Sequence, residues 1–199
     1  MKEIVLASGN VGKLKEFREM LADFRVLSPK DLNISVDVEE TGATFYDNAL
    51  IKAKALYELC GLPTLADDSG LCVDALDGAP GVMSARYSGG GDAENNKKLL
   101  ADLNGKKNRA AHFACCIVYY DGSNIIASEG KTFGHIENEL FGNGGFGYDP
   151  LFFSDDLNKT FGEASAEEKN SVSHRARALA ELVNKLRELR VTNPKDNTR

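Results

Sequence analysis

An acidic pair that directly follows a short apolar run constrains the fold of this chain more than any other feature. The run covers residues 64–66, and Asp67, Asp68, Ser69 and Gly70 follow it. The apolar residues predict a buried strand, and the Ser-Gly pair predicts a turn that ends this strand. Ligands of open α/β sheets bind at the carboxyl ends of strands. The pattern therefore predicts a binding site at this turn.

The two carboxylates are expected to play different roles. Successive side chains of a strand point to opposite faces, so only one of Asp67 and Asp68 can face a given cleft squarely. The other is expected to fix the turn by accepting hydrogen bonds from backbone N–H groups. A carboxylate in such a place suits Mg²⁺, which takes oxygen ligands and often shares them with substrate phosphates. The same four residues are also typical of a plain Asx turn, which is the structural alternative.

The composition excludes several classes of protein. A hydrophobic fraction of 42% and a charged fraction of 27% indicate an ordinary globular protein, and 199 residues suffice for one large domain or two small lobes. The formal net charge of −6 argues against a nucleic-acid partner. No apolar run approaches the roughly 20 residues of a membrane span, and the first residues lack the apolar region of a signal peptide.

The cysteines point to a reducing compartment. Cys60, Cys72, Cys115 and Cys116 show no C-x-x-C spacing, and two of them are adjacent. This arrangement favours buried free thiols over a disulfide framework or a zinc site. We therefore expect a cytoplasmic protein that binds neither nucleic acid nor a membrane.

A glycine-rich turn near the N-terminus predicts an anion-binding site. Residues 2–8 have the pattern of a strand, residues 8–13 read Ser-Gly-Asn-Val-Gly-Lys, and an amphipathic helical pattern follows. Free backbone N–H groups and the helix dipole favour an anion there, and Lys13 would add a positive charge. A Walker A loop needs four residues between its glycine and its Gly-Lys pair, whereas this chain has two. The turn is therefore no P-loop, and a structural strand-to-helix turn remains the alternative.

Two further acids, Glu39 and Glu40, precede a helix predicted over residues 44–60. Acids in this position usually complement the helix dipole or remain solvated. One of them could instead be a second metal ligand beside the aspartate pair. Asn48, one turn into the helix, could face the same cleft.

The remaining pattern predicts strands and helices in an order typical of an α/β protein. It places strands at residues 24–28 and 72–76, a long ordered loop at 77–91, a helix at 94–103 and a hairpin at 110–120 and 125–133. The alternation of strands and helices thus gives way to antiparallel strands. We therefore expect an α/β fold with a mixed sheet, in which a single domain of residues 1–199 has two lobes with a cleft between them. Residues 191–199 are expected to be a frayed tail.

A second glycine-rich stretch, residues 142–150, could contact a planar base. Glycine permits close approach of the backbone, and Phe146 or Tyr148 could stack on a base. Asp149 is held extended by the following proline, and its carboxylate could accept a hydrogen bond from a base or a ribose. Low-complexity flexibility is the alternative, but apolar residues flank the stretch on both sides.

Two cations open the last predicted helix, which runs to about residue 190. Ser173 is a natural N-cap, which places His174 and Arg175 in the first turn. Cations there oppose the helix dipole, so a purely structural helix would carry acids instead. We infer an anionic or acceptor-bearing ligand nearby, to which Lys169 would add a further positive charge.

Six short motifs occur together in the order of a known family. They are Ser8-Gly9-Asn10-x-Gly12-Lys13, Glu39-Glu40-Thr41-Gly42, Ala66-Asp67-Asp68-Ser69-Gly70, Pro80-Gly81-x-x-Ser84-Ala85-Arg86-Tyr87, Gly144-Gly145-Phe146-Gly147-Tyr148-Asp149-Pro150 and Glu168-Lys169-x-x-x-Ser173-His174-Arg175. From Lys2 to about Leu189 the chain resembles the inosine/xanthosine triphosphate pyrophosphatases, the Ham1-like family.

The resemblance implies a fold and an activity. The fold would be a two-lobed, anticodon-binding-like α/β homodimer with a nucleotide cleft between the lobes. The activity would be Mg²⁺-dependent hydrolysis of noncanonical purine nucleoside triphosphates (ITP, dITP and XTP) to the monophosphate and pyrophosphate, with Mn²⁺ as a conceivable substitute. The enzyme would thereby cleanse the nucleotide pool.

The resemblance also assigns roles to residues. Asp68 would be a metal ligand and the general base, and Glu39 would be the acidic metal partner, with Glu40 as the alternative. The triphosphate would be held by Ser8, Gly9, Asn10, Val11, Gly12 and Lys13. The further substrate-binding residues would be Ser69, Phe146, Gly147, Tyr148, Asp149, Lys169, His174 and Arg175. The chain departs mildly from the family pattern at Ser8, where Thr is common, and at Asp47, where Glu is frequent.

The chemistry of the bases explains how such a site would select its substrate. Hypoxanthine and xanthine carry a 6-oxo acceptor where adenine carries an amino donor, so a fixed donor such as Arg175 or a backbone N–H would discriminate steeply. Guanine also carries a 6-oxo group, and the sequence locates no element that would exclude it. A nucleotide-binding module without hydrolysis is the alternative function, and the absent Walker A spacing argues against a phosphotransferase.

Overall fold

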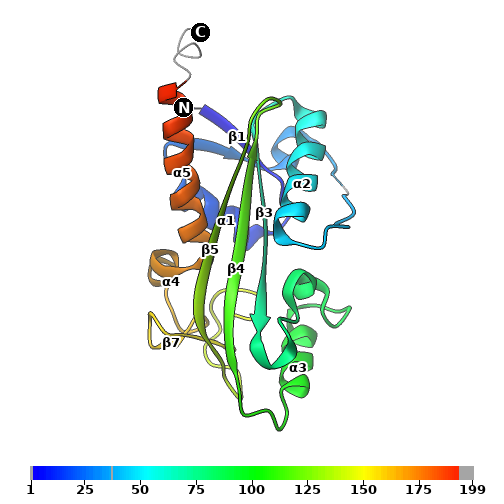
Figure 1. Cartoon of the computed structure of the whole chain (residues 1–199), viewed down its shortest axis with the longest axis vertical. Coiled ribbons are helices and arrows are strands. Elements are labelled where there is room, and N and C mark those ends of the chain that lie inside the picture. Colours follow the sequence, from blue (N-terminus) through cyan, green and yellow to red (C-terminus); the bar gives the residue numbers. More distant parts are fainter. Residues whose placement is uncertain (1, 37, 193–199) are drawn as a thin grey trace.

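A single mixed sheet organises the molecule (Figure 1). The computed structural model describes residues 2–36 and 38–192, and these form seven strands in the order β2-β1-β3-β4-β5-β6-β7. The strands are β1 (Lys2–Leu6), β2 (Phe24–Leu27), β3 (Thr64–Val73), β4 (Ala110–Tyr120), β5 (Ile125–Ile136), β6 (Phe152–Ser154) and β7 (Lys159–Thr160). β1 pairs in parallel with β2 and β3, and all other pairs are antiparallel. The predicted mixed α/β fold is confirmed.

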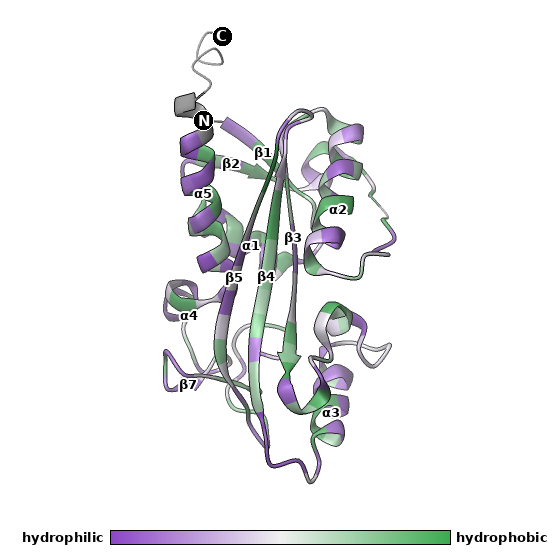
Figure 2. Ribbon diagram, in the orientation of Figure 1, coloured by the Kyte–Doolittle hydropathy of each residue, from purple (hydrophilic) through white to green (hydrophobic). Residues whose placement is uncertain are grey.

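Helices cover both faces of this sheet. They are α1 (Val11–Met20), α2 (Phe45–Cys60), α3 (Asp92–Asp102), α4 (Ala166–Val172) and α5 (His174–Thr192), with short 3₁₀ helices η1 (Pro29–Leu32), η2 (Asp74–Leu76) and η3 (Gly81–Arg86). α1 and α5 pack against one face through a shared hydrophobic cluster, and α2 packs against the other face through Ala49 and Ala53. Hydrophobic and hydrophilic residues alternate along α2 and α5, as expected for helices with one buried face (Figure 2). No helix in the described ranges is long and apolar enough to span a bilayer.

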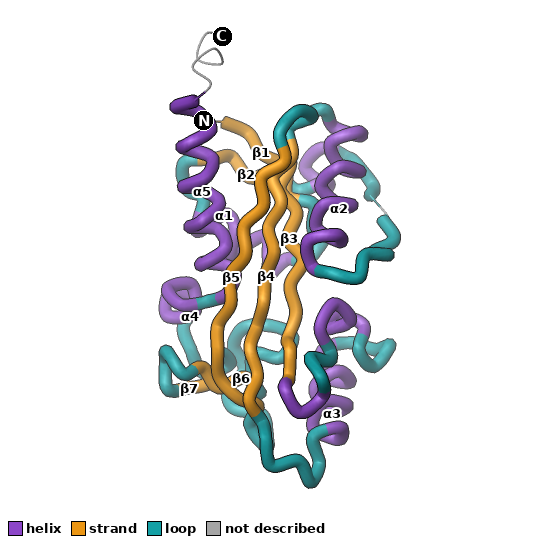
Figure 3. The backbone as a smooth tube through the Cα atoms, in the orientation of Figure 1, coloured by secondary structure: helices purple, strands orange, loops and turns teal. Residues whose placement is uncertain are grey.

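The long strands β3, β4 and β5 connect two hydrophobic clusters at opposite ends of the molecule (Figure 3). Leu65 of β3 packs with α1 and α5, whereas Leu71 of the same strand packs with α3 and with the segment around β6. Alternate residues of a strand share a face, so Asp67 and Ser69 lie between the two clusters. The polar centre of β3 therefore lies at the boundary between two cores.

One prediction about β3 is wrong. Ser69 and Gly70 do not end the strand, because β4 pairs with β3 continuously from Thr64 to Val73. Gly70 instead marks a close approach of another segment, a common reason for glycine within a strand. A Cβ atom at Gly70 would lie 2.2 Å from the carbonyl oxygen of Gly81 in η3. The predicted strand at residues 72–76 is the end of β3 followed by η2.

The other elements largely follow the predictions. α2 begins after the N-cap Thr44 and ends at the left-handed Gly61, and β4 and β5 form the predicted hairpin. The Ser173 hydroxyl accepts a hydrogen bond from the N–H of Ala176 at 3.1 Å, as expected of an N-cap. The sequence pattern did not predict α4, β6 or β7. Of the tail predicted to be frayed, residues 193–199 lie outside the described residues, and α5 extends to Thr192.

Replacement of Gly130 by alanine is expected to destabilise the fold. A Cβ atom at Gly130 of β5 would lie 2.1 Å from the carbonyl oxygen of His174 and 2.5 Å from the backbone nitrogen of Ala178, so α5 would have to move. Overpacking of this kind lowers the free energy of unfolding by about 1–3 kcal/mol. Urea denaturation followed by circular dichroism measures the loss. Gly9→Ala is the control, because its Cβ meets no atom within 4 Å. Equal midpoints for the two variants would contradict the packing of α5 on β5.

Candidate active site

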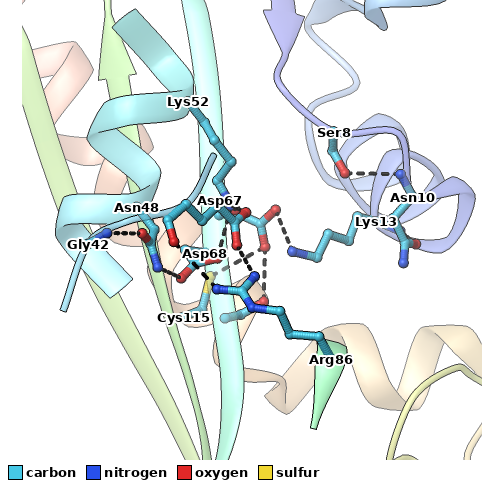
Figure 4. A network of polar contacts seen from close by, with 12 residues as sticks. Ser8, Asn10, Lys13, Gly42, Asn48, Lys52, Asp67, Asp68, Arg86 and Cys115 are labelled. Atoms are coloured by element: carbon cyan, nitrogen blue, oxygen red, sulfur yellow. Dashed lines mark hydrogen bonds and ion pairs between the residues drawn. The ribbon is translucent and has the colours of Figure 1, made fainter. Parts of the chain in front are cut away.

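The acid pair lies where β3 extends beyond β1. β1 pairs with β3 only as far as Leu65. Beyond that point side chains bind the backbone of β3: the Lys52 ammonium donates to the carbonyl of Asp67 at 2.9 Å, and the Ser84 hydroxyl accepts from the N–H of Leu71 at 2.9 Å. Asp67 and Asp68 point to opposite faces of the strand and meet different partners (Figure 4). The prediction that the two carboxylates face opposite sides of the strand is confirmed.

Asp67 is held by cations and not by a turn. Its carboxylate is fully buried and lies 3.1 Å from the Lys13 ammonium and 3.0 Å from the Arg175 guanidinium. The Ser69 hydroxyl donates to it at 3.1 Å. Burial alone would raise the pKa of Asp67, but Lys13 and Arg175 outweigh this effect and hold that pKa well below its ordinary value. The expectation that this second carboxylate accepts the backbone N–H groups of a turn is therefore wrong.

Asp68 has the opposite electrostatic character. Its carboxylate faces α2, where the Lys52 ammonium lies at 2.9 Å and the Asn48 amide donates at 3.3 Å. Burial raises the pKa of Asp68 above its ordinary value, although Lys52 works against this rise. Lys52 also lies 2.9 Å from the carboxylate of Glu40. Two carboxylates from different segments thus converge on one ammonium, while Glu39 is exposed.

The predicted phosphate loop joins β1 to α1. The Asn10 side chain caps α1 by accepting from the N–H of Lys13 at 3.0 Å, and the N–H of Asn10 donates to the Ser8 hydroxyl at 3.2 Å. This confirms the predicted order of strand, glycine turn and helix. Gly12 approaches Phe146 so closely that a Cβ atom would lie 2.7 Å from the ring. The loop is therefore in contact with the second glycine-rich stretch.

A pocket brings together most of the residues singled out in the sequence. Its lining includes Asn10, Lys13, Ser69, Phe146, Gly147, Tyr148, Asp149, Lys169, His174 and Arg175. Ser8, Gly9, Val11, Gly12, Glu39 and Asp68 lie outside this lining. Asp68 is nevertheless adjacent in sequence to two residues that face the pocket or its floor, Asp67 and Ser69. The pocket and the Asp68 carboxylate therefore lie on the two sides of one strand.

Buried charges alternate along the floor of this pocket. The Lys169 ammonium lies 2.7 Å from Asp149 and 3.0 Å from Glu16, and Glu16 also binds Arg175 through a short ion pair. Lys169 lies over the Phe146 ring at 4.5 Å from its centroid. Each buried charge thus has an opposite partner, which a low-dielectric site requires.

His174 lies in the same pocket but is uncharged. It is stacked on Phe113, with ring centroids 4.8 Å apart. Burial lowers the pKa of His174 well below its ordinary value, and the neighbouring Arg175 lowers it further. Among the described residues, its Nδ1 atom finds no hydrogen-bond partner. This buried nitrogen therefore has a hydrogen-bonding capacity that no described protein group uses.

Sequence analysis missed three charged residues of the site. Glu16 lies three positions after Lys13 on α1, the spacing at which helical side chains share a face. Lys52 lies four positions after Asn48 on α2, and this polar pair interrupts an otherwise apolar stripe. Arg86 binds Glu40 from η3, and no local periodicity connects these two residues. The first two could have been found from helical spacing, whereas the third depends on tertiary structure.

Comparisons with known proteins identify relatives of this chain. A profile described as the Ham1 family matches residues 4–185. The chain is 52% identical over 186 residues to a dITP/XTP pyrophosphatase of Treponema denticola, covering 89% of this chain and 94% of that protein. It is 50% identical over 197 residues to a dITP/XTP pyrophosphatase of Ralstonia nicotianae, covering 94% and 98%.

Solved structures extend this similarity to the fold. The Staphylococcus aureus Ham1 protein superposes with a TM-score of 0.85 at 40% identity, covering 94% of this chain and 99% of that chain. A HAM1 protein from Coxiella burnetii gives the same TM-score at 41% identity, covering 94% and 100%. This chain belongs to the Ham1 family.

Proposed function

We propose that this chain is a nucleoside-triphosphate pyrophosphatase. It hydrolyses ITP, dITP and XTP to the nucleoside monophosphate and pyrophosphate, and so removes noncanonical purines from the nucleotide pool. The observation that carries the proposal is the arrangement around the acid pair: Asp67 binds Lys13 of the capped loop and Arg175 of the pocket, while Asp68 on the other side of the strand shares Lys52 with Glu40. Relatives about 50% identical over most of the chain bear the name dITP/XTP pyrophosphatase, which supports the same reaction.

The N-terminal loop would hold the triphosphate. In this proposal Gly9, Val11 and Gly12 offer backbone N–H groups, and Ser8 and Asn10 offer side-chain donors, at the start of α1, where the helix dipole favours an anion. Lys13 would add a point charge and can reach the acid pair, since its ammonium already lies 3.1 Å from Asp67.

A divalent metal ion fits the opposite side of β3. Mg²⁺ usually takes one or two carboxylates and completes its octahedron with water and substrate phosphates. Among the described residues no group of three or more His, Cys, Asp or Glu has the geometry of a metal site, so the protein alone offers an incomplete set. Asp68 and Glu40 do converge on one positive charge, the Lys52 ammonium, at 2.9 Å each. We propose that Asp68 and Glu40, in place of Glu39, hold Mg²⁺ or Mn²⁺ together with the triphosphate.

The reaction would be a displacement at the α-phosphate. Asp68 would accept the proton of the attacking water, and its raised pKa brings it closer to the working pH of a general base. A metal ion bound there would supply positive charge against the phosphate oxygens and acidify that water. The protein otherwise contributes position and charge, which is what phosphoryl displacement mainly requires.

The pocket would read the purine base. An arginine has five N–H donors, and four hydrogen bonds of Arg175 go to Asp67, Glu16 and Ser69, which leaves one donor for a ligand. Lys169 likewise uses two of its three donors on Asp149 and Glu16. Donors fixed in this way would pair with a 6-oxo group and leave the amino group of adenine unpaired. Phe146 would stack on the base, with Gly147, Tyr148 and His174 completing the wall.

Product analysis tests the proposed reaction. The purified protein is incubated with ITP, XTP, ATP and GTP, with Mg²⁺ or with EDTA, and pyrophosphate and orthophosphate are measured separately. We expect pyrophosphate from ITP and XTP, little from ATP and GTP, and none with EDTA. Orthophosphate as the first product would contradict attack at the α-phosphate. Saturable binding without any product would support a nucleotide-binding module instead.

We further propose a cytoplasmic homodimer in which residues 1–199 form one domain of two lobes. Light scattering at micromolar concentration tests the assembly, and the mass of a monomer would contradict it.

Asp68→Asn is expected to abolish pyrophosphate release from ITP. The amide can neither accept the proton of the attacking water nor bind a metal ion as an anion. We expect a fall in kcat of about 10²-fold or more, by the usual magnitude for loss of a general base. Asp156→Asn is the control, since it removes a half-exposed carboxylate that pairs with Arg177 outside the pocket lining. A fully active Asp68→Asn protein would sink the assignment.

Glu40→Gln and Glu39→Gln form a matched pair for the metal site. Glu40 shares Lys52 with Asp68, and Glu39 is exposed one residue away. We therefore expect Glu40→Gln to raise the Mg²⁺ concentration needed for half-maximal activity by about tenfold or more, because one anionic ligand is lost. Glu39→Gln should change this Mg²⁺ concentration by no more than about twofold relative to the wild-type protein. A larger effect of Glu39→Gln than of Glu40→Gln would identify Glu39 as the metal ligand instead.

Lys52→Gln is expected to shift the pH dependence of activity. The ionised form of Asp68 is the active one, so kcat/KM falls as the pH drops through the raised pKa of Asp68. Lys52 lowers this pKa, and its removal leaves the effect of burial unopposed. The acid limb of kcat/KM for ITP should therefore move to higher pH in Lys52→Gln and stay in place in the control Lys185→Gln. An acid limb that moves to lower pH would contradict the assigned role of Asp68.

A further inference from the structure

Arg86 lies at the end of η3, whose backbone is held firmly against β3. η3 is pressed onto β3 at Gly70, where a Cβ atom would lie 2.5 Å from the Ser84 hydroxyl. The Ser84 hydroxyl binds the N–H of Leu71 at 2.9 Å, and the Tyr148 hydroxyl donates to the Ser84 carbonyl at 2.8 Å. The backbone that carries Arg86 is thus fixed to β3 and to the second glycine-rich stretch, residues 142–150.

The side chain of Arg86, in contrast, is held loosely. Its guanidinium lies 3.0 Å from the Glu40 carboxylate and 3.4 Å from the Glu40 carbonyl, and 44% of the side chain is exposed. Figure 4 shows it reaching toward the carboxylates around Asp68. An exposed ion pair of this kind contributes little to stability. Stabilisation of the fold is therefore a weak reason for an arginine at this position.

Lys13 and Arg86 can each leave a carboxylate that still keeps a second cationic partner. When Lys13 leaves Asp67, Arg175 remains on that carboxylate at 3.0 Å. When Arg86 leaves Glu40, Lys52 remains on that carboxylate at 2.9 Å. Lys52 is different, because it serves Glu40, Asp68 and the carbonyl of Asp67 together. Lys13 and Arg86 are therefore the two cations of the site that can move from a carboxylate to a ligand and leave that carboxylate paired with another cation.

We propose that Arg86 is a phosphate-binding residue that transfers from Glu40 to the two outer phosphates of the triphosphate. The inference rests on the proposed function and deepens it. As the water oxygen bonds to the α-phosphorus, the bond from that phosphorus to the bridging oxygen breaks, and its electron pair leaves with pyrophosphate. The proton of the water passes to Asp68. Arg86 neutralises the charge that develops on the pyrophosphate, for which the planar fork of arginine is well suited.

Binding of inorganic pyrophosphate and of IMP tests this role. Both ligands are titrated calorimetrically in the presence of Mg²⁺ into the wild-type protein, Arg86→Gln, Arg86→Lys and Arg177→Gln. Arg177 is the matched control, because it forms a similar ion pair at 2.9 Å with 41% of its side chain exposed, but its partner is Asp156 and not a carboxylate that shares Lys52 with Asp68.

We expect Arg86→Gln to weaken pyrophosphate binding about tenfold or more and to leave IMP binding within about twofold, because IMP lacks the outer phosphates. Arg86→Lys should recover part of the loss, and Arg177→Gln should change neither ligand. A purely structural role for Arg86 predicts something else: equal losses for both ligands, together with a lower melting temperature. That result, unchanged pyrophosphate binding in Arg86→Gln, or no pyrophosphate binding to the wild-type protein would overturn the inference.

The product assay with ITP separates this inference from the proposed function. If the wild-type protein releases pyrophosphate from ITP and Arg86→Gln binds pyrophosphate normally, the inference about Arg86 alone is wrong. If the wild-type protein releases only orthophosphate, the proposed function fails, and the inference fails with it.

Discussion

The buried carboxylate of Asp67 is the charge on which the rest of the site depends. It lies on β3 with no exposed surface on its side chain, and it is neutralised by Lys13 from α1 and Arg175 from α5. A buried carboxylate must be compensated by opposite charges, and here α1 and α5 each supply one of them. Three elements far apart in the sequence are therefore held together by one carboxylate. The same ion pairs set the position of Lys13 at the loop between β1 and α1 and of Arg175 in the pocket.

The adjacent aspartates differ in chemistry because a strand presents them to different surroundings. Asp67 meets cations that lower its pKa, whereas burial next to fewer cations raises the pKa of Asp68. A pair of carboxylates whose pKa values are pushed apart is a common way to separate an anchoring role from a proton-accepting one. Continuous pairing of β3 with β4 keeps this separation, since a turn at Ser69 and Gly70 would allow the two side chains to rotate.

The sequence predicted the elements whose signals are local. The apolar stripe, the Thr44 cap and Gly61 define α2, and the capped turn of residues 8–13 defines the start of α1. The ending of β3 was mispredicted because a Ser-Gly pair is a local turn signal, while the partner strand β4 that keeps it extended lies more than 40 residues away. The short strands β6 and β7 carry too few residues for a period to be visible.

For the site, the sequence identified residue types better than it identified pairings. Most of the expected substrate-binding residues line one pocket. They could be predicted because the motifs that contain them occur together in the family order. Glu16 and Lys52 were missed because a charged residue on a helix is usually solvated, although each is at helical spacing from another polar residue of the site. Arg86 lies in a segment predicted to be a loop, and only tertiary structure shows that it faces Glu40. Choosing between Glu39 and Glu40 had the same difficulty. The two are adjacent, and only the position of Lys52 distinguishes them.

Helix α1 connects the two ends of the site. Its first turn carries Lys13, which binds Asp67, and its next turn carries Glu16, which binds both Lys169 and Arg175. The charges from Asp149 through Lys169, Glu16, Arg175 and Asp67 to Lys13 alternate in sign, so no member can move without changing the field on its neighbours. A ligand that draws Lys13 away from Asp67 leaves Arg175 as the main counter-charge of that carboxylate. In the proposed function, phosphate binding at Lys13 and base recognition beside Arg175 and Lys169 would therefore act on the same set of charges.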